Sequence, residues 1–203
     1  ILIYTHGSWG NERKLNGCKN SWGQIPPAIY QLDGSKINDL TIKTYQLCSG
    51  VRGWTKKEED LFWDTYDENN QEVSKVLNLK DKSGILLVNK WKGPMKQKVM
   101  KLKIDEFINK GYKNIVLSGH SAGGWDSLIL KSKFPSKING VVAFNPARSA
   151  KFAKQNKPHR GWVNWRNHKI SLIKLDKIDK VLIYSHGKDQ YENPETLSFL
   201  SNS

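Results

Sequence analysis

The sequence is poor in cysteine and has no long apolar segment. Cys18 and Cys48 are the only cysteines in 203 residues, and no cysteine–histidine cluster has the spacing of a metal site. No apolar run approaches the roughly eighteen residues that cross a bilayer as a helix. Internal repeats and low-complexity linkers are also missing. The sequence therefore argues against a transmembrane helix, a repeat array and a metal centre, and nothing in it indicates a cofactor.

Acidic residues are scarcer than basic ones. The chain has 19 Asp and Glu against 33 Lys and Arg, which gives a formal net charge of +14. A surface this basic attracts polyanions such as nucleic acids. The basic residues are scattered, however, and one predicted helix combines Asp105 and Glu106 with lysines in the manner of a solvated face: Lys96, Lys98, Lys101, Lys103 and Lys110. We therefore do not expect nucleic-acid binding to be the main activity.

The stretch 114–125, NIVLSGHSAGGW, carries the strongest signal of function. An apolar segment at 115–117 predicts a buried strand, a helical pattern follows, and between them Gly119, Ser121 and Gly123 form the pattern G-x-S-x-G. A serine in so sharp a turn needs strained backbone geometry, and side chains at positions 119 and 123 would collide with the neighbouring strand or helix. In this context the pattern predicts that Ser121 is a nucleophile. The alternative is a glycine-rich turn without chemistry.

A second motif lies at the amino end of the chain. Residues 1–4 form an apolar segment that predicts a strand, and His6 and Gly7 follow it in the run THGSWG. Together with the serine motif, this run resembles the oxyanion loop of the α/β-hydrolase family. In that family an N–H of this loop and the N–H of the residue after the nucleophile hold the negative oxygen of the intermediate. The alternative is that His6 and Gly7 merely close a turn.

The resemblance assigns several roles by position. It implies an α/β-hydrolase fold, in which a mostly parallel central sheet carries helices on both faces. The oxyanion donors would be the backbone N–H groups of Ser8 and Ala122, with Trp9 as second choice for the first. Trp9 is also the candidate for a wall of the substrate pocket. Within the family, the chain resembles small esterases and the dienelactone-hydrolase-like branch most. That branch often has cysteine where this chain has Ser121, so we expect ester rather than dienelactone chemistry.

The run VLIYSHGKD at 181–189 offers an acid. It predicts an apolar strand that ends in a polar loop carrying Asp189. The family places its acid after the second strand that follows the nucleophile helix, and the strands predicted there are 138–144 and 181–184. The resemblance thus makes Asp189 the group that holds the catalytic histidine in its tautomer. The alternative is that Asp189 caps a helix suggested by residues 193–195.

No histidine follows Asp189, although the family's order is serine, acid, histidine. His6 and His120 belong to the two oxyanion motifs and are not expected to act as the base. We therefore expect that the sequence is cut at both ends, because it opens on what resembles the family's third strand and stops inside a predicted helix at 197–203. On this interpretation one or two strands precede it, and a last strand, a histidine loop and a final helix follow Ser203. The five histidines of the chain are His6, His120, His159, His168 and His186.

The remaining pattern is that of one α/β domain, spanning 1–203. A chain of this length can bury roughly 70% of the surface that it exposes when unfolded. A strand is predicted at 40–47, and helices are predicted at 96–110 and 122–133 on either side of the serine strand. The first of these helices should stop at Gly111.

Two insertions exceed the minimal fold, at about 51–94 and 145–173. The first predicts a helix from Thr55, because T-x-x-E with Glu58 is a capping box. Loops after parallel strands carry binding in such sheets, so these insertions are candidates to shape the substrate site. Core packing is expected for Trp63, Trp91 and Trp125. Other candidates near the motifs or in the insertions are Trp22, Trp54, Trp162, Trp165, and, for a carboxylate, Arg148, Arg160 and Arg166.

The two cysteines leave the compartment open. Cys18 follows the oxyanion loop and Cys48 ends the predicted strand 40–47, so both are expected near one end of the sheet. A bridge between them would imply an oxidising compartment, such as the periplasm or the outside of the cell. Two unpaired buried thiols would fit the cytosol equally well.

The sequence thus predicts a serine hydrolase of carboxylic esters that works through an acyl-enzyme, with a small-molecule ester as its substrate. Its assigned groups are Ser121, Asp189, Ser8 and Ala122, with Trp9 at the pocket. The alternative is a catalytically inactive member of the same fold that binds a ligand or a protein, and a missing histidine would be the natural signature of such a member.

Overall fold

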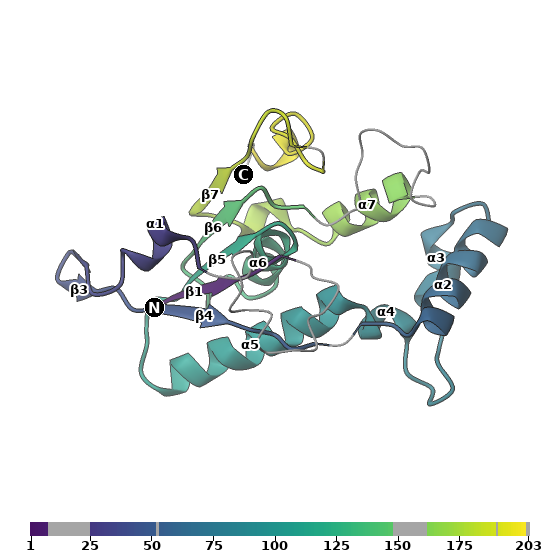
Figure 1. Cartoon of the computed structure of the whole chain (residues 1–203), viewed down its shortest axis with the longest axis horizontal. Helices are drawn as coiled ribbons and strands as arrows, with labels where there is room; N and C mark the ends of the chain where they lie inside the picture. The colour runs from purple at the N-terminus through teal and green to yellow at the C-terminus, as the bar shows by residue number, and fades with distance from the viewer. Residues whose placement is uncertain (8–24, 52, 148–161, 190, 202–203) are drawn as a thin grey trace.

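The computed structural model is built around one parallel sheet (Figure 1). Five strands form it in the order β4–β1–β5–β6–β7, and every neighbouring pair is parallel. The protein therefore has the α/β architecture predicted from its sequence. The strands are β1 (Leu2–Thr5), β4 (Thr44–Leu47), β5 (Val116–His120), β6 (Gly140–Phe144) and β7 (Val181–Tyr184). The structure describes residues 1–7, 25–51, 53–147, 162–189 and 191–201.

The strand order reverses next to β1. From β1 the chain crosses to β4 on one side, and it later returns to β5 on the other side. The register pairs Thr5 with both Leu47 and Gly119, so these three strands end at a common edge. In open α/β sheets, ligands bind in the crevice outside the carboxyl ends of the strands at such a reversal. The loops that follow β1 and β5, which carry the two motifs, lie at this reversal.

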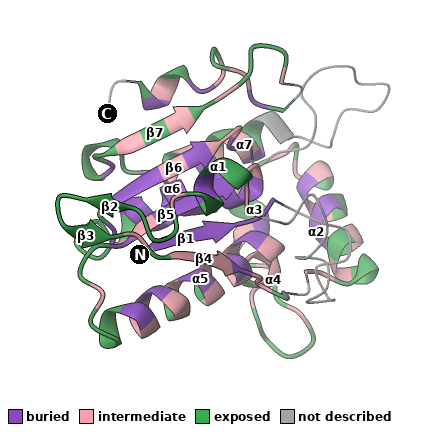
Figure 2. Cartoon of the chain, turned by 60° about the vertical axis from the view of Figure 1, so that its left-hand side comes forward, coloured by how far each residue is buried: buried purple, intermediate pink, exposed green. Residues whose placement is uncertain are grey.

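Helices cover both faces of the sheet. Ile3 packs into the larger core with residues of α5 (Lys92–Asn109) and α6 (Ala122–Lys133). Its neighbours Leu2 and Tyr4 point to the other face, where they pack with Ile29 of α1 (Pro27–Tyr30). This alternation is the two-residue period of a strand that is buried on both faces. Figure 2 shows the resulting buried band along β1 and β6.

The helices flanking the serine strand follow the sequence closely. α6 has the predicted bounds, whereas α5 begins at Lys92, ahead of the predicted start at Lys96. Pro94 hides this earlier start in the sequence, because proline is tolerated only in the first turn, where the N–H groups have no partner inside the helix. Gly111 takes a φ of +89° directly after the helix, which confirms the predicted stop.

The strand predicted at 40–47 is wrong as a single element. Residues 36–41 form a small hairpin instead, with β2 (Lys36–Ile37) paired antiparallel to β3 (Leu40–Thr41), and only Thr44–Leu47 joins the main sheet. The turn residues Asn38 and Asp39 both have positive φ, at 47° and 64°. Asparagine and aspartate tolerate this conformation, which suits a tight two-residue hairpin turn.

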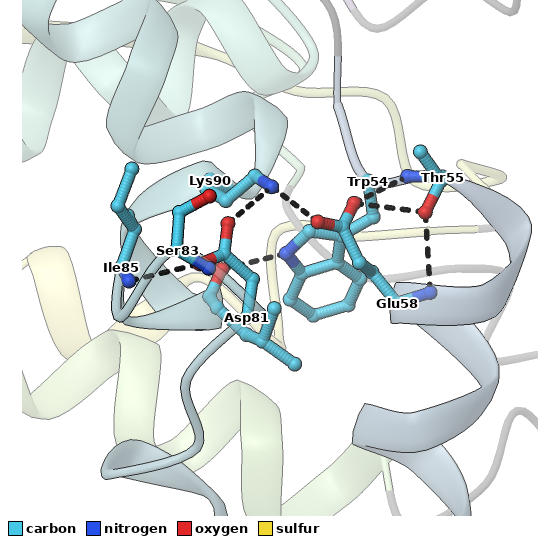
Figure 3. Close-up of polar contacts among 8 residues, drawn as sticks. Trp54, Thr55, Glu58, Asp81, Ser83, Ile85 and Lys90 are labelled. Carbon is cyan, nitrogen blue, oxygen red and sulfur yellow. Dashed lines mark hydrogen bonds and ion pairs between the residues drawn. The ribbon is translucent and has the colours of Figure 1, made fainter.

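The first insertion forms three helices, α2 (Lys56–Glu68), α3 (Val73–Leu77) and α4 (Leu87–Lys90). The predicted capping box is present at the start of α2, where Thr55 and Glu58 bond each other's backbone N–H. Lys90 then joins this box to a loop, because its ammonium pairs with the carboxylates of Glu58 and Asp81 (Figure 3). The indole N–H of Trp54 donates to Leu87 O at 2.6 Å beside this pair.

The two insertions share one aromatic core. Trp165 of α7 (Trp162–Ser171), in the second insertion, is buried against Phe62 and Trp63 of α2. The ammonium of Lys169 lies 4.7 Å from the Trp165 ring centroid and 5.1 Å from that of Trp91. Figures 1 and 2 place α2 and α3 beyond the ends to which the strand arrows point. The helices α2 and α3 therefore lie on the side of the sheet where β1 and β5 end and the two motifs follow.

The last described residues add little regular structure. After α7 come a short 3-10 turn, Leu175–Lys177, and β7, and a second 3-10 turn covers Ser198–Leu200. The helix predicted at 197–203 is thus wrong over its described part, which is a single tight turn. Within the part of the chain that the structure describes, none of the helices is both long and apolar enough to cross a membrane.

Candidate active site

Ser121 occupies the sharp turn between β5 and α6. Its backbone has a φ of 53° and a ψ of −123°, a region that residues other than glycine rarely adopt. Ser121 N donates to Phe144 O at 2.9 Å, and Ser121 O accepts from Trp125 N at 3.1 Å and from Ala147 N at 3.2 Å. The strained geometry predicted for this serine is therefore present, and the residues around the end of β6 help to hold it.

The two motif glycines are required by close backbone packing. A Cβ atom on Gly123 would lie 2.3 Å from Thr5 O and 2.6 Å from His6 O. A Cβ atom on Gly119 would lie 2.5 Å from the carbonyl carbon of Gly123. All three distances are shorter than those that real Cβ atoms show, so the predicted collisions are confirmed. The first turn of α6 thus lies directly on the end of β1.

The loop after β1 reaches the serine itself. A Cβ atom on Gly7 would lie 3.1 Å from Ser121 Cβ and 3.4 Å from His120 O. The structure therefore brings the two sequence motifs together at one point. Ala122 is the first residue of α6, where the N–H groups have no acceptor within the helix. Ser8 and Trp9, the other oxyanion and pocket candidates, lie outside the described residues.

His6 is held neutral beside this contact. Its Nδ1 lies 2.6 Å from Gly7 O, and because a carbonyl oxygen only accepts, we assign the proton to Nδ1. Burial, with a smaller contribution from the charge of Lys96, lowers the pKa of His6 to about 4. The ring is therefore uncharged near neutral pH. The backbone oxygens of His6 and Gly7 also accept hydrogen bonds from the Lys96 ammonium.

The loop that carries Asp189 adjoins the same edge of the sheet. Asn145 connects it to the serine turn, because Asn145 N donates to Tyr184 O (2.6 Å) and its side-chain oxygen accepts from His186 N (3.1 Å). Asp189 Oδ1 accepts from the backbone N–H groups of Tyr191 (2.7 Å) and Glu192 (3.0 Å). Asp189 therefore closes a turn, and residues 193–195 form no helix that it could cap.

Asp189 also acts electrostatically on the serine motif. Burial lowers the pKa of His120, and the negative charge of Asp189 opposes part of that shift. The carboxylate is thus within electrostatic reach of the residue that precedes Ser121. Arg166 anchors the same loop, because its guanidinium forms a bidentate pair with the buried Glu192 at 2.7 Å and bonds Thr196 O at 2.6 Å. This arginine serves the loop and is not a free carboxylate site.

The other histidines have other neighbours. His186 Nδ1 accepts from Lys188 N at 3.1 Å within its own turn. His168 lies beside the Trp165 ring in α7, with ring centroids 5.3 Å apart. His159 lies in a part of the chain that the structure does not describe, as do Arg148, Arg160 and Trp22. These contacts give no reason to assign the base to either of the two described here.

Several tryptophans belong to cores. Trp125 is completely buried in the main core, and Trp63 is buried in the aromatic core of the insertions, where the half-buried Trp91 packs against it. The packing role predicted for these three is therefore confirmed. Trp54 and Trp165, which were candidates for the substrate site, belong to the same aromatic core.

Sequence reasoning missed Lys96 and Asn145. Lys96 was interpreted as part of a solvated face, and this is wrong, because only 2% of it is exposed. The signal was its spacing of four from Met100, which together with Ile104 and Phe107 forms the buried stripe of α5. Asn145 gives only a weak signal, as a polar residue that ends an apolar strand.

Cys48 is disulfide-bonded, and Cys18 is the only other cysteine of the chain. A disulfide at Cys48 is typical of oxidising compartments; Cys18 lies outside the described residues. Among the residues with described positions, no group of three or more His, Cys, Asp or Glu could hold a metal ion. Comparisons of the chain with protein-family models, with curated proteins and with solved structures find no match.

Proposed function

We propose that the protein is a serine hydrolase that cleaves carboxylic esters through an acyl-enzyme. The observation that carries this proposal is the strained backbone of Ser121 at the reversal of the strand order, with Gly7 packed against it. Strain of about 1–3 kcal/mol at one residue persists only where the surroundings impose it, and it concentrates at functional sites. A glycine-rich turn without chemistry would not need a non-glycine residue in this conformation.

The proposed reaction uses the serine as a nucleophile. Ser121 Oγ attacks the ester carbonyl carbon while a base takes its proton, and the carbonyl oxygen becomes negative. The N–H groups of Ala122 and Ser8 would hold that oxygen. The base then protonates the departing alcohol, and water releases the acyl group in a second addition and elimination. Asp189 is the proposed acid that orients the base.

The substrate side of the site remains a proposal as well. The insertions lie beyond the carboxyl ends of the strands, where loops carry binding in parallel sheets (Figures 1 and 2). We propose that they limit the size of the acyl or alcohol group, with Trp9 as one wall of the pocket. The rival proposal is a non-catalytic binding protein of the same fold, which the unassigned base favours.

The test measures covalent labelling and turnover in the protein expressed from its complete gene. A fluorophosphonate should label Ser121, and p-nitrophenyl esters should be hydrolysed. Ser121→Ala should abolish labelling and lower kcat by about a millionfold, because nothing replaces the nucleophile. Ser132→Ala is a matched control at the far end of α6, where the hydroxyl accepts from Lys174 N at 2.6 Å. This variant should keep both activities.

Two outcomes would decide against the enzyme. Undiminished turnover in Ser121→Ala would show that another group does the chemistry. A folded, complete protein that neither reacts with the probe nor hydrolyses any ester would favour the binding protein.

A further inference from the structure

Lys96 is a buried lysine that points at the candidate active site. It lies in the second turn of α5, and 2% of the residue is exposed. Lysine is almost never fully buried unless it is paired, because an ammonium loses its hydration there. Its Nζ donates to His6 O and, at 3.3 Å, to Gly7 O. The chain thus places a cation against two consecutive carbonyl groups of the loop after β1.

Those two carbonyl groups belong to the backbone that faces the nucleophile. His6 O lies against the first turn of α6, since a Cβ atom on Gly123 would be 2.6 Å from it. Gly7 O accepts a second hydrogen bond, from His6 Nδ1 at 2.6 Å. The Cα of Gly7 itself packs against Ser121. Lys96 and His6 therefore both donate hydrogen bonds to carbonyl groups of the loop whose Gly7 packs against Ser121.

We propose that Lys96 is a positioning residue, whose ammonium sets the orientation of the peptide units around Gly7 and thereby the direction of the loop's N–H donors. This inference rests on the proposed hydrolase function. A peptide unit is planar and trans, so an oxygen fixed at one corner fixes the N–H at the opposite corner. The carbonyl of Gly7 shares its peptide unit with the N–H of Ser8, to which the family resemblance assigns an oxyanion bond.

The charge of Lys96 would also stabilise the transition state directly. A fixed cation close to the site stabilises negative charge that develops in a poorly hydrated environment. It also keeps the imidazole of His6 neutral, because protonation would place two positive charges side by side. The stabilisation of negative charge acts more strongly on the transition state than on the uncharged ester.

Lys131 offers a matched comparison within the same protein. It is also 2% exposed, and its ammonium donates to Ile138 O at 2.8 Å and pairs with Asp179. Ile138 precedes β6, however, so this lysine lies at the amino ends of the strands. If Lys96 only ties backbone segments together, replacement of either lysine should have the same kind of effect.

The experiment compares Lys96→Met with Lys131→Met, since methionine keeps an unbranched apolar stem and removes the ammonium. Both variants should be destabilised in urea unfolding. Lys96→Met should also lower kcat for a p-nitrophenyl ester by about 10–100-fold, with KM within about twofold, because the lost interaction is made in the transition state. Lys131→Met should leave kcat within about twofold of the wild type. Lys96→Gln, which keeps a shorter donor, serves as the second variant if Lys96→Met does not fold.

The outcomes separate this inference from the proposed function. A folded Lys96 variant with wild-type kcat, in a protein whose turnover depends on Ser121, would overturn the positioning role and leave the hydrolase intact. An equal loss of kcat in both methionine variants would mean that Lys96 only stabilises the fold, as Lys131 does. If Ser121→Ala leaves turnover unchanged, the hydrolase proposal itself fails, and the role of Lys96 falls with it.

Discussion

At both ends of the parallel strands a buried lysine donates hydrogen bonds to backbone carbonyl groups, but the packing around it differs. At the amino ends, Lys131 donates to the carbonyl of Ile138 and pairs with an exposed carboxylate. At the carboxyl ends, a buried lysine again holds backbone carbonyls, but here a Cβ atom on Gly123 would lie 2.3 Å from Thr5 O. Ser121 is strained at that same end. The backbone at the carboxyl ends of the strands is therefore tightly packed at Gly123 and strained at Ser121.

The difference between the two ends helps to distinguish contacts that only stabilise the fold from those that serve catalysis. Buried lysines and short backbone contacts can hold a fold together anywhere in a molecule, so neither is evidence of function by itself. Within the described part of the chain, backbone strain, close glycine packing and a neutral buried imidazole occur together only at the carboxyl ends of the strands. Pairs of substitutions, one at the carboxyl ends of the strands and one at the amino ends, test whether the features of the carboxyl ends serve catalysis.

Among these paired substitutions, the largest difference is expected between the two aspartates that flank β7. Asp189 follows the strand at its carboxyl end, and Asp179 precedes it at the amino end, where it pairs with Lys131. Asp189→Asn should lower kcat by roughly ten-thousandfold, by analogy with loss of the acid in other triads. The amide oxygen can still accept from Tyr191 N and Glu192 N, so the turn should survive. Asp179→Asn should leave kcat unchanged.

Steady-state kinetics on one ester, with circular dichroism as a check of folding, measures both variants. A loss below about tenfold in Asp189→Asn would assign the acid to another residue. A comparable loss in Asp179→Asn would remove the contrast between the two ends.

A smaller effect is expected when the glycine packing of the two ends is compared. Gly123→Ala places a methyl group 2.3 Å from Thr5 O, whereas Gly140→Ala places one 2.9 Å from Lys180 O. Both obstacles are backbone atoms that cannot rotate away. Overpacking typically costs about 1–3 kcal/mol and occasionally more, so Gly123→Ala should lie at or beyond the upper limit and Gly140→Ala near the lower one. Urea unfolding of both variants gives the difference, and equal costs would contradict the tighter packing at the carboxyl ends.

The remaining prediction concerns the pH dependence of stability. The pKa of His6 is about 4 in the folded protein, below its ordinary value of 6.5. As the pH falls from 6.5 to 4, the unfolded chain takes up a proton at this residue before the folded protein does. His6 should therefore contribute stability that is complete above pH 6.5 and is lost by pH 4, up to about 3 kcal/mol.

His6→Asn isolates this contribution, because its amide nitrogen can replace Nδ1 as the donor to Gly7 O and does not titrate. Urea unfolding at pH 7 and at pH 4.5 should show a smaller loss of stability in the variant than in the wild type. Identical pH dependence in the two proteins would mean that His6 is not held neutral by its surroundings.

Local patterns predicted much of the fold. The bounds of α6 and β7 follow from the sequence, because the glycine-flanked serine and the run VLIY specify their own conformation. The division of 40–47 was missed because Leu40 and Thr41 are as compatible with a strand in the main sheet as with a hairpin. Of the site, the strained serine turn and the close packing of Gly119 and Gly123 were predicted, whereas the contact of Gly7 with Ser121 became visible only in the structure. Lys96 was not, because its partner carbonyl at His6 is 90 positions away and a buried lysine has the same letter as an exposed one.

The central place of β1 has a consequence for how the chain reaches this structure. β1 is synthesised before both of its neighbours, and one of them is β5, which follows the whole first insertion and α5. Until β5 leaves the ribosome, one side of an apolar central strand has unpaired N–H and C=O groups. Such non-local parallel pairing is slow and exposes the chain to aggregation. We expect refolding yields to fall steeply with protein concentration, and we expect the nascent chain to need protection until the serine turn has been made.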